Sequence, residues 1–171
     1  MSKFPIPGVS TIAREIEIAA SPATVWRIMA DPEQFKRLIP DMVALDPSKK
    51  GVAEVGQKLK ATGKLAGMRV ELFYEVFEAE VNKKFGVKQT PGGFFEVHQG
   101  TTFLEPSKTG TRATINFTYK VSNGYLGKLL SKVVVDRIVR ANFEAYVDNL
   151  KSLSELEALH SESRKPRKTE E

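Results

Sequence analysis

The chain has 171 residues, of which 41% are hydrophobic and 27% charged, with a formal net charge of +5, the composition of one globular domain with flanking tails. The absence of cysteine excludes disulfides, thiol nucleophiles and thiolate metal sites, and having only two histidines, His98 and His160, makes a histidine-rich metal site or relay hard to build. The sequence contains no apolar run long enough to span a membrane and no apolar run typical of a secretory signal. We therefore expect a cytoplasmic protein, and we expect neither a metal nor a cofactor.

The N-terminal part of the chain predicts an arm, a strand and two short helices. Residues 1–9 are rich in proline and are expected to form an extended arm, and the alternation in 10–20 predicts a strand. Two helix-start signals follow, Ser21-Pro22 and Asp31-Pro32. A serine or aspartate side chain caps the free N–H groups of a helix, and a proline at the first position needs no hydrogen-bond donor. Two short helices are therefore predicted at about 21–30 and 31–39, before Pro40.

Alternation of apolar and polar residues then predicts a series of strands. They are expected at 41–46, 56–67, 68–81, 83–90, 94–105 and 111–121, with turns at the intervening prolines and glycines. The alternation is most regular in 111–121, where Ile115, Phe117 and Tyr119 share one face. These segments predict an antiparallel sheet with one apolar face.

The last part of the chain predicts one long helix, from about Gly124 to about Leu159. Such a helix would be about 50 Å long, whereas a compact domain of this size is about 40 Å across. We therefore expect it to bend, or to protrude beyond about Leu150. Its apolar stripe also moves by about 130° between the two halves, which is typical of a helix that first covers a hollow and then packs on a sheet.

Strands followed by one long helix predict an α+β fold. The apolar face of the sheet needs a cover, and the long helix is the only predicted element of sufficient size. Because sheets twist, this sheet should curl around the helix. The two short helices after the first strand would then close one end of the apolar interior.

Two segments resemble a known family. SPATVWRIMADPEQFKRLIPDM resembles the start, and GYLGKLLSKVVVDRIVRANFEAYVDNLKSL the last helix, of the polyketide cyclase/dehydrase and lipid transport branch of the START-related, birch-pollen-allergen-like superfamily. The resemblance spans about residues 10–155. It implies a helix-grip fold, with an apolar cavity between sheet and helix, and ligands such as lipids, polyketides or quinones. Its members include cyclases, carriers and proteins of unknown role, so the resemblance leaves catalysis open.

The resemblance also suggests a division of the chain. Residues 1–9 would be the arm, 10–159 the helix-grip ligand-binding domain, and 160–171 a basic disordered tail. If the apolar face of each strand looks inward, the cavity wall follows from the alternation, and pockets of this type hold roughly 300–1,000 Å³. Each such residue alone is explained by core packing, but the set predicts a ligand-binding wall: Leu59, Leu65, Val70, Leu72, Tyr74, Val76, Phe85, Val87, Phe95, Val97, Gln99, Phe103, Ile115, Phe117 and Tyr119, with Leu126, Leu130, Val133 and Val134 from the helix.

Three polar residues that could face the cavity, Arg137 from the helix among them, are candidates for catalysis: Tyr74, Tyr119 and Arg137. Tyrosine and arginine side chains can polarise a carbonyl group in an aldol-type cyclisation. The alternative for Arg137 is an ion pair with a surface carboxylate. By alternation, His98 should lie on the outer face of its strand, opposite Phe95 and Val97.

The paired carboxylates Glu71 and Glu75 are also expected on the outer face, so acid–base work by them is not expected. The leading functional prediction is therefore the binding of a hydrophobic small molecule in an internal cavity, as carrier or sensor.

Two alternatives remain open. One is an enzyme of the polyketide cyclase/aromatase/dehydratase type, without a metal. The other is a protein-interaction module that uses the outer sheet face and the basic tail, where Arg164, Lys165, Arg167 and Lys168 cluster. That cluster contains no aromatic residue on which a base could stack, so we do not expect nucleic-acid binding, and any membrane contact would be weak. The sequence makes no prediction of oligomeric state.

Overall fold

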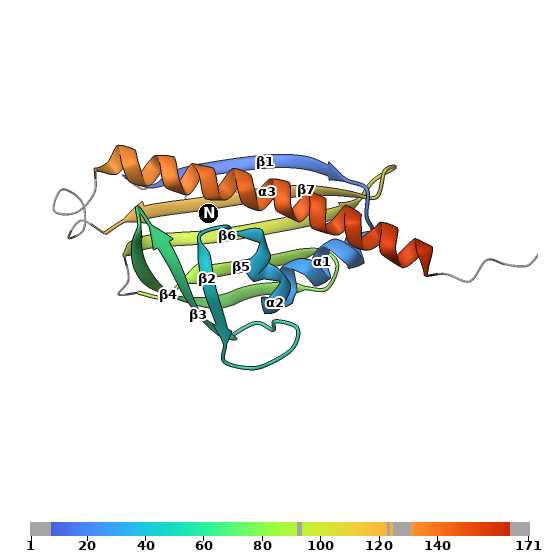
Figure 1. Cartoon of the computed structure of the whole chain (residues 1–171), viewed down its shortest axis with the longest axis horizontal. Helices are drawn as coiled ribbons and strands as arrows, with labels where there is room; N and C mark the ends of the chain where they lie inside the picture. Colours follow the sequence, from blue (N-terminus) through green and yellow to red (C-terminus); the bar gives the residue numbers. More distant parts are fainter. Residues whose placement is uncertain (1–7, 92–93, 123, 125–130, 165–171) are drawn as a thin grey trace, which may run out of the picture.

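The computed structural model describes residues 8–91, 94–122, 124 and 131–164 (Figure 1). The fold is α+β: a curved antiparallel sheet is covered on one face by a long C-terminal helix, and two short helices follow the first strand, as predicted. The elements are β1 (Ser10–Ile18), α1 (Pro22–Ala30), α2 (Pro32–Phe35), the 3₁₀ turn η1 (Lys36–Leu38), β2 (Met42–Pro47), β3 (Lys58–Leu65), β4 (Met68–Glu80), β5 (Lys84–Gln89), β6 (Phe95–Pro106), β7 (Thr111–Val121) and α3 (Lys132–Ser163).

The strand order of the seven-stranded sheet is β1-β7-β6-β5-β4-β3-β2. Consecutive strands from β2 to β7 are neighbours, whereas β1 pairs with β7 from Ser10↔Tyr119 to Ile18↔Thr111. β1 and β2 are therefore the two edges of the sheet. This explains the helices between them, because α1, α2 and η1 carry the chain from one edge to the other and contact α3 and β2 on the way.

The helix-start signals act as predicted. The Ser21 hydroxyl accepts a hydrogen bond from the Thr24 N–H at 3.3 Å, and the Asp31 carboxylate accepts one from the Glu33 N–H at 2.9 Å. A proline follows each cap at the start of the helix. The second helix is only one α-helical turn, which tightens into η1 before Pro40.

Helix α3 begins later than predicted. Ser131 is extended and caps the helix, its hydroxyl accepting a hydrogen bond from the Val134 N–H at 3.4 Å, so the helix starts at Lys132 instead of near Gly124. The helix then continues to Ser163, so residues 160–163, which the sequence assigned to a disordered tail, are helical. At 1.5 Å per residue its 32 residues span about 48 Å. Its C-terminal end projects beyond the sheet in Figure 1, as the length argument predicted.

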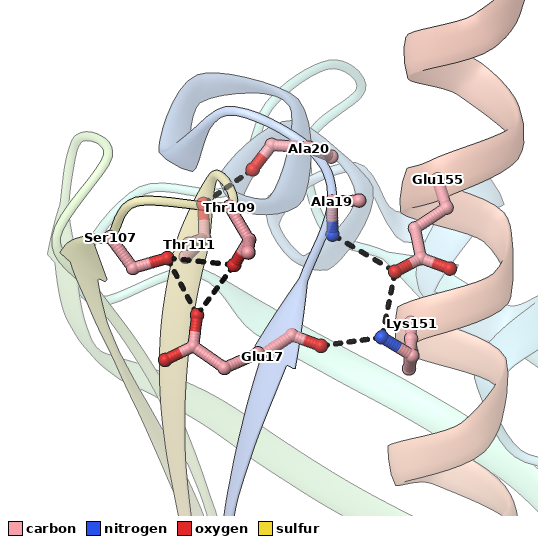
Figure 2. Close-up of polar contacts among 8 residues, drawn as sticks. All are labelled: Glu17, Ala19, Ala20, Ser107, Thr109, Thr111, Lys151 and Glu155. Atoms are coloured by element: carbon pink, nitrogen blue, oxygen red, sulfur yellow. Dashed lines mark hydrogen bonds and ion pairs between the residues drawn. The ribbon is translucent and has the colours of Figure 1, made fainter.

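A polar network fastens α3 to the end of β1 (Figure 2). The Glu17 carboxylate accepts hydrogen bonds from Ser107 at 2.6 Å and Thr109 at 2.9 Å in the β6–β7 turn. From α3, the Lys151 ammonium donates to the Glu17 carbonyl, and the Glu155 carboxylate accepts a hydrogen bond from the Ala19 N–H at 2.9 Å. This backbone hydrogen bond is the main cause that lowers the pKa of Glu155. The network holds the second half of α3 in place.

The two halves of α3 meet different surroundings. Val147 and Leu150, in the second half, are buried in the core to which Val25 and Met29 of α1 also belong. Ile138 to Tyr146 instead face a cavity above the sheet. The helix does cover a hollow and then pack, but the position is not the predicted one: the sequence assigned the cover to residues up to Val134 and the packing to residues from Val139 onward, whereas Val139 and Phe143 line the cavity. Among the described residues, no helix combines the length and the apolar character needed to cross a membrane.

Candidate functional site

A cavity of about 170 Å³ lies between the inner face of the sheet and helix α3. Strands β2 to β7 form its floor, residues 138–146 of α3 its roof, and Phe35 and Ile39 close one side. The volume is below the roughly 300–1,000 Å³ common for ligand pockets, but close to the roughly 150 Å³ of an apolar cavity that binds benzene. The interior is therefore not a solid core, and in this conformation its size suits a molecule of one or two rings.

Most of the predicted wall on β3, β4, β5 and β7, and the first residue of β6, do line the cavity. The residues that the structure brings together there are Leu59, Leu65, Val70, Leu72, Tyr74, Phe85, Val87, Phe95, Ile115 and Phe117. Val76 is fully buried in the packed core, and Tyr119 is also buried; neither belongs to the lining. That the lining residues contact a ligand remains a prediction.

The predicted orientation of β6 is wrong beyond its first residue. A β-bulge lies between Phe95 and Val97, where one residue of β6 has no partner on β7. An extra residue of this kind reverses the alternation of the strand. Val97, Gln99 and Phe103 consequently lie outside the cavity lining, and the Phe103 side chain is 38% exposed. The ammonium group of Lys84 lies 4.7 Å from the centre of the Phe103 ring.

The same bulge turns His98 inward, although the sequence predicted an outer position. His98, Gly100 and Thr102 follow one another on the inner face of β6 and line the cavity. Strict alternation could not reveal this, because a bulge leaves no clear signal in a single sequence. Sequence reasoning also missed the α3 residues Ile138 and Phe143. The serine cap at Ser131, followed by apolar residues at a spacing of four, was the signal that would have found them.

The predicted helical wall residues are not part of the cavity. Val133 is 68% exposed and Val134 is 40% exposed, since both lie in the first turn of α3. Leu126 and Leu130 lie outside the described residues.

The three catalytic candidates do not converge. Only Tyr74 lines the cavity. The Tyr119 hydroxyl donates a hydrogen bond to the Asp136 carboxylate at 2.9 Å, outside the cavity, and Asp136 is also paired with Lys132. The Arg137 side chain is exposed, as expected for its alternative role at the surface. A joint catalytic role for Tyr74, Tyr119 and Arg137 therefore has no geometric support.

The main polar group of the cavity is instead a pair formed by Tyr74 of β4 and His98 of β6. Their Oη and Nδ1 atoms are 3.0 Å apart and share a hydrogen bond. The His98 ring also packs against Phe95, at 4.4 Å between centroids, and against Phe117, at 4.8 Å and edge-on. Burial lowers the pKa of His98 to about 3 and raises the pKa of Tyr74. Both side chains are therefore neutral at physiological pH.

A second polar pair joins the floor to the roof. The hydroxyl groups of Thr102 on β6 and Tyr146 on α3 lie 3.2 Å apart. Burial raises the pKa of Tyr146 to about 12, so this phenol also stays neutral. Tyr146 and Phe35, with ring centroids 6.1 Å apart, narrow the cavity at this point.

A polar rim lies between α3 and the β2–β3 edge. The Asn142 amide donates a hydrogen bond to the Asp41 carboxylate at 3.0 Å, and the Lys64 N–H donates to the Asp41 carbonyl at 2.9 Å. All three residues line the cavity, and Lys64 is exposed. The lining therefore reaches the surface here.

Opposite charges are paired on the outer face of the sheet at β3 and β4. Glu71 and Glu75 lie there, as predicted, and form ion pairs with Lys60 at 2.9 Å and Lys58 at 2.7 Å. Of the predicted basic cluster, Arg164 is exposed, and residues 165–171 lie outside the described residues. Within the described part of the chain, no group of three or more histidine, aspartate or glutamate side chains is placed to hold a metal ion.

Comparisons with known proteins agree with this architecture. The crystal structure of TTHA0849 from Thermus thermophilus is 23% identical, with a TM-score of 0.68 over 85% of this chain and 97% of that one. A START superfamily protein from Mycobacterium smegmatis is 15% identical, with a TM-score of 0.68 and the same coverage, 85% and 97%. The Zhui aromatase/cyclase from Streptomyces sp. R1128 is 14% identical, with a TM-score of 0.67 over 89% and 94%. At these identities the structures establish the fold alone.

No curated protein matches the chain. The model of one family, described as polyketide cyclase/dehydrase and lipid transport, matches residues 10–155. These residues include every strand of the sheet and all of the α3 segment that covers the cavity. The chain therefore belongs to the polyketide cyclase/dehydrase and lipid transport family, and it has the helix-grip fold of the START-related, birch-pollen-allergen-like superfamily.

Proposed function

We propose that this protein binds a hydrophobic small molecule in the cavity between the sheet and α3, as a carrier or a sensor. The observation that supports this is the cavity of about 170 Å³, whose wall is mostly apolar. A void of this size forfeits packing contacts, at a cost of about 24 cal/mol per Å³ in cores. A bound apolar molecule would recover those contacts and shield the wall from water.

The test compares two substitutions at neighbouring positions of β4. Leu72 lines the cavity, whereas Phe73 is 50% exposed on the opposite face of the strand. Leu72→Trp places a larger side chain in the cavity and should weaken the binding of indane, a neutral two-ring hydrocarbon, at least tenfold in an NMR titration. Phe73→Trp should bind indane like the wild type. Equal binding by both variants would show that the hydrocarbon lies elsewhere.

Native mass spectrometry of the freshly purified protein gives a second readout of the same prediction. Any molecule that co-purifies should be lost from Leu72→Trp and kept by Phe73→Trp. Extraction of the wild-type protein with solvent then identifies it.

A second candidate function is catalysis of the polyketide cyclase/aromatase/dehydratase type. The observation that favours it is the position of Tyr74 and His98 in the cavity, where a phenol can polarise a carbonyl group. With its pKa lowered to about 3, however, His98 is a weak proton acceptor. Because Tyr119 and Arg137 also do not join Tyr74 at the cavity, the site supports binding better than acid–base catalysis.

An enzyme assay distinguishes the two functions. If the protein cyclises a poly-β-ketone precursor, Tyr74→Phe should reduce kcat at least a hundredfold while indane still binds. Tyr119→Phe is the matched control, because the Tyr119 hydroxyl is bonded to Asp136 outside the cavity. Full turnover by Tyr74→Phe would exclude this role for the phenol.

A further inference from the structure

The hydrogen-bonding capacity of Tyr74 and His98 is only partly used. Their mutual bond, 3.0 Å long, is the one hydrogen bond that either side chain makes with the described residues. A neutral imidazole has one N–H donor and one nitrogen lone pair, and a phenol has one O–H donor and an oxygen that accepts. The pair therefore contains two donors, and its internal bond consumes one of them.

The remaining donor exists in either tautomer of His98. If the Tyr74 hydroxyl donates to Nδ1, the proton of the imidazole is on Nε2 and that N–H is left over. If Nδ1 carries the proton and donates to Tyr74, the phenol O–H is left over. In both arrangements the pair keeps one N–H or O–H donor without a partner among the described residues. A buried donor left without a partner costs about 1–3 kcal/mol.

The surroundings of the pair favour a neutral partner. Phe95 and Phe117 pack around the His98 ring, and no charged side chain of the described residues bonds to the pair. The charged residues of the lining, Asp41 and Lys64, belong to the rim. A carboxylate placed beside the pair would lose its hydration without gaining a counter-charge.

The wall also leaves room beside His98. Gly100 is the next inward residue of β6, and a Cβ atom built there would lie 3.5 Å from a Phe117 ring carbon, which is an ordinary contact. The backbone of Gly100 therefore does not require glycine. The lack of a side chain keeps open the space next to the pair.

We propose that the Tyr74–His98 pair is the polar anchor of the cavity and selects a neutral hydrophobic molecule that carries a carbonyl oxygen, in preference to a hydrocarbon or a carboxylate of the same shape. The carbonyl oxygen accepts a hydrogen bond from the N–H or O–H that the Tyr74–His98 bond does not use, and the rest of the molecule lies against the apolar wall. This inference rests on the proposed binding function and specifies the chemistry of its ligand.

Three probes of one shape test the proposal: indane, 1-indanone and indane-1-carboxylate. Titrated against the full chain, 1-indanone should bind at least tenfold more tightly than indane, and the carboxylate should bind no better than indane. The carbonyl stretch of bound 1-indanone should lie at lower frequency than in hexane, because its oxygen accepts a hydrogen bond. This infrared readout needs no variant.

A double variant then locates the donor. Each single substitution leaves a donor in place, since Tyr74→Phe keeps an imidazole N–H and His98→Phe keeps the phenol O–H. Only Tyr74→Phe/His98→Phe removes both donors. This double variant should bind indane like the wild type and should bind 1-indanone no more tightly than indane. The matched control is Tyr146→Phe/Thr102→Val, because it removes both hydroxyl donors of the other polar pair of the cavity and should keep the tenfold preference.

The outcomes separate this inference from the function on which it rests. Failure of both indane and 1-indanone to bind contradicts the cavity-binding function, and the anchor fails with it. Equal binding of the two by the wild type, or an unshifted carbonyl stretch, overturns the anchor alone. So does a Tyr74→Phe/His98→Phe variant that retains the preference, or a carboxylate that binds more tightly than the ketone.

Discussion

Replacement of Gly110 by alanine should destabilise the protein by at least about 3 kcal/mol. Gly110 ends the β6–β7 turn with a φ of +143°, a backbone conformation that residues with a Cβ rarely adopt. A Cβ at this position would lie 2.6 Å from the Ile18 carbonyl oxygen and 2.7 Å from the Ala20 carbonyl oxygen. Both contacts are with backbone at the end of β1, so no side chain can rotate to relieve them.

The consequences would spread beyond the turn. The end of β1 also carries the Glu17 network of Figure 2. Just beyond it, the Ala20 carbonyl accepts a hydrogen bond from the Thr111 hydroxyl at 2.6 Å. Displacing this backbone would therefore disturb the junction of β1, β7 and α1.

Gly56→Ala is the matched control for Gly110→Ala. Gly56 has a φ of +87°, but nothing lies within 4 Å of a Cβ built there. Its alanine variant should lose only about 1–2 kcal/mol of unfolding free energy, which is the cost of a Cβ in this backbone conformation. Urea unfolding followed by the fluorescence of Trp26, the single tryptophan, measures both. A Gly110 variant no less stable than the Gly56 variant would show that the turn adapts freely.

Acidification from pH 7 to pH 5 should cost the wild-type protein about 2 kcal/mol of stability through His98. Burial lowers the pKa of His98 to about 3 in the folded protein, whereas an unfolded histidine titrates near about 6.5. Between these values the unfolded chain binds a proton that the folded chain does not. Stability therefore falls as the pH falls through this range.

His98→Gln should remove this loss, because the amide does not titrate and can still bond to Tyr74. Urea unfolding at pH 7, 6 and 5 gives the free energy of unfolding of each protein. The difference between wild type and His98→Gln at each pH measures the contribution of His98. The window lies above the ordinary pKa of carboxylates, about 4, and the comparison of wild type with variant at each pH removes the contribution that both proteins share.

The other histidine supplies the control for this experiment. His160 is exposed on α3, so His160→Gln should keep the full pH dependence of the wild type. A His98→Gln variant with that same dependence would mean that His98 is solvated and protonates freely in the folded state.

The order of the elements could be predicted because each depends on local patterns. Ser21 and Asp31 cap their helices through atoms two or three residues away. The regular alternation of β7 placed Ile115 and Phe117 on the cavity wall. The length of the C-terminal helix indicated that it would bend or protrude, and its end protrudes. The start of α3 was missed although a local signal, the cap at Ser131, was present.

The sequence by itself determined the α+β class, the strand order along the chain and the apolar inner face, because these follow from periodicity and from short-range capping. Only the tertiary structure decided which face of β6 looks inward, and with it the pairing of His98 with Tyr74. The reason is physical. A bulge is a property of two paired strands, and a hydrogen bond between β4 and β6 depends on the register of the strand between them, which no single segment encodes.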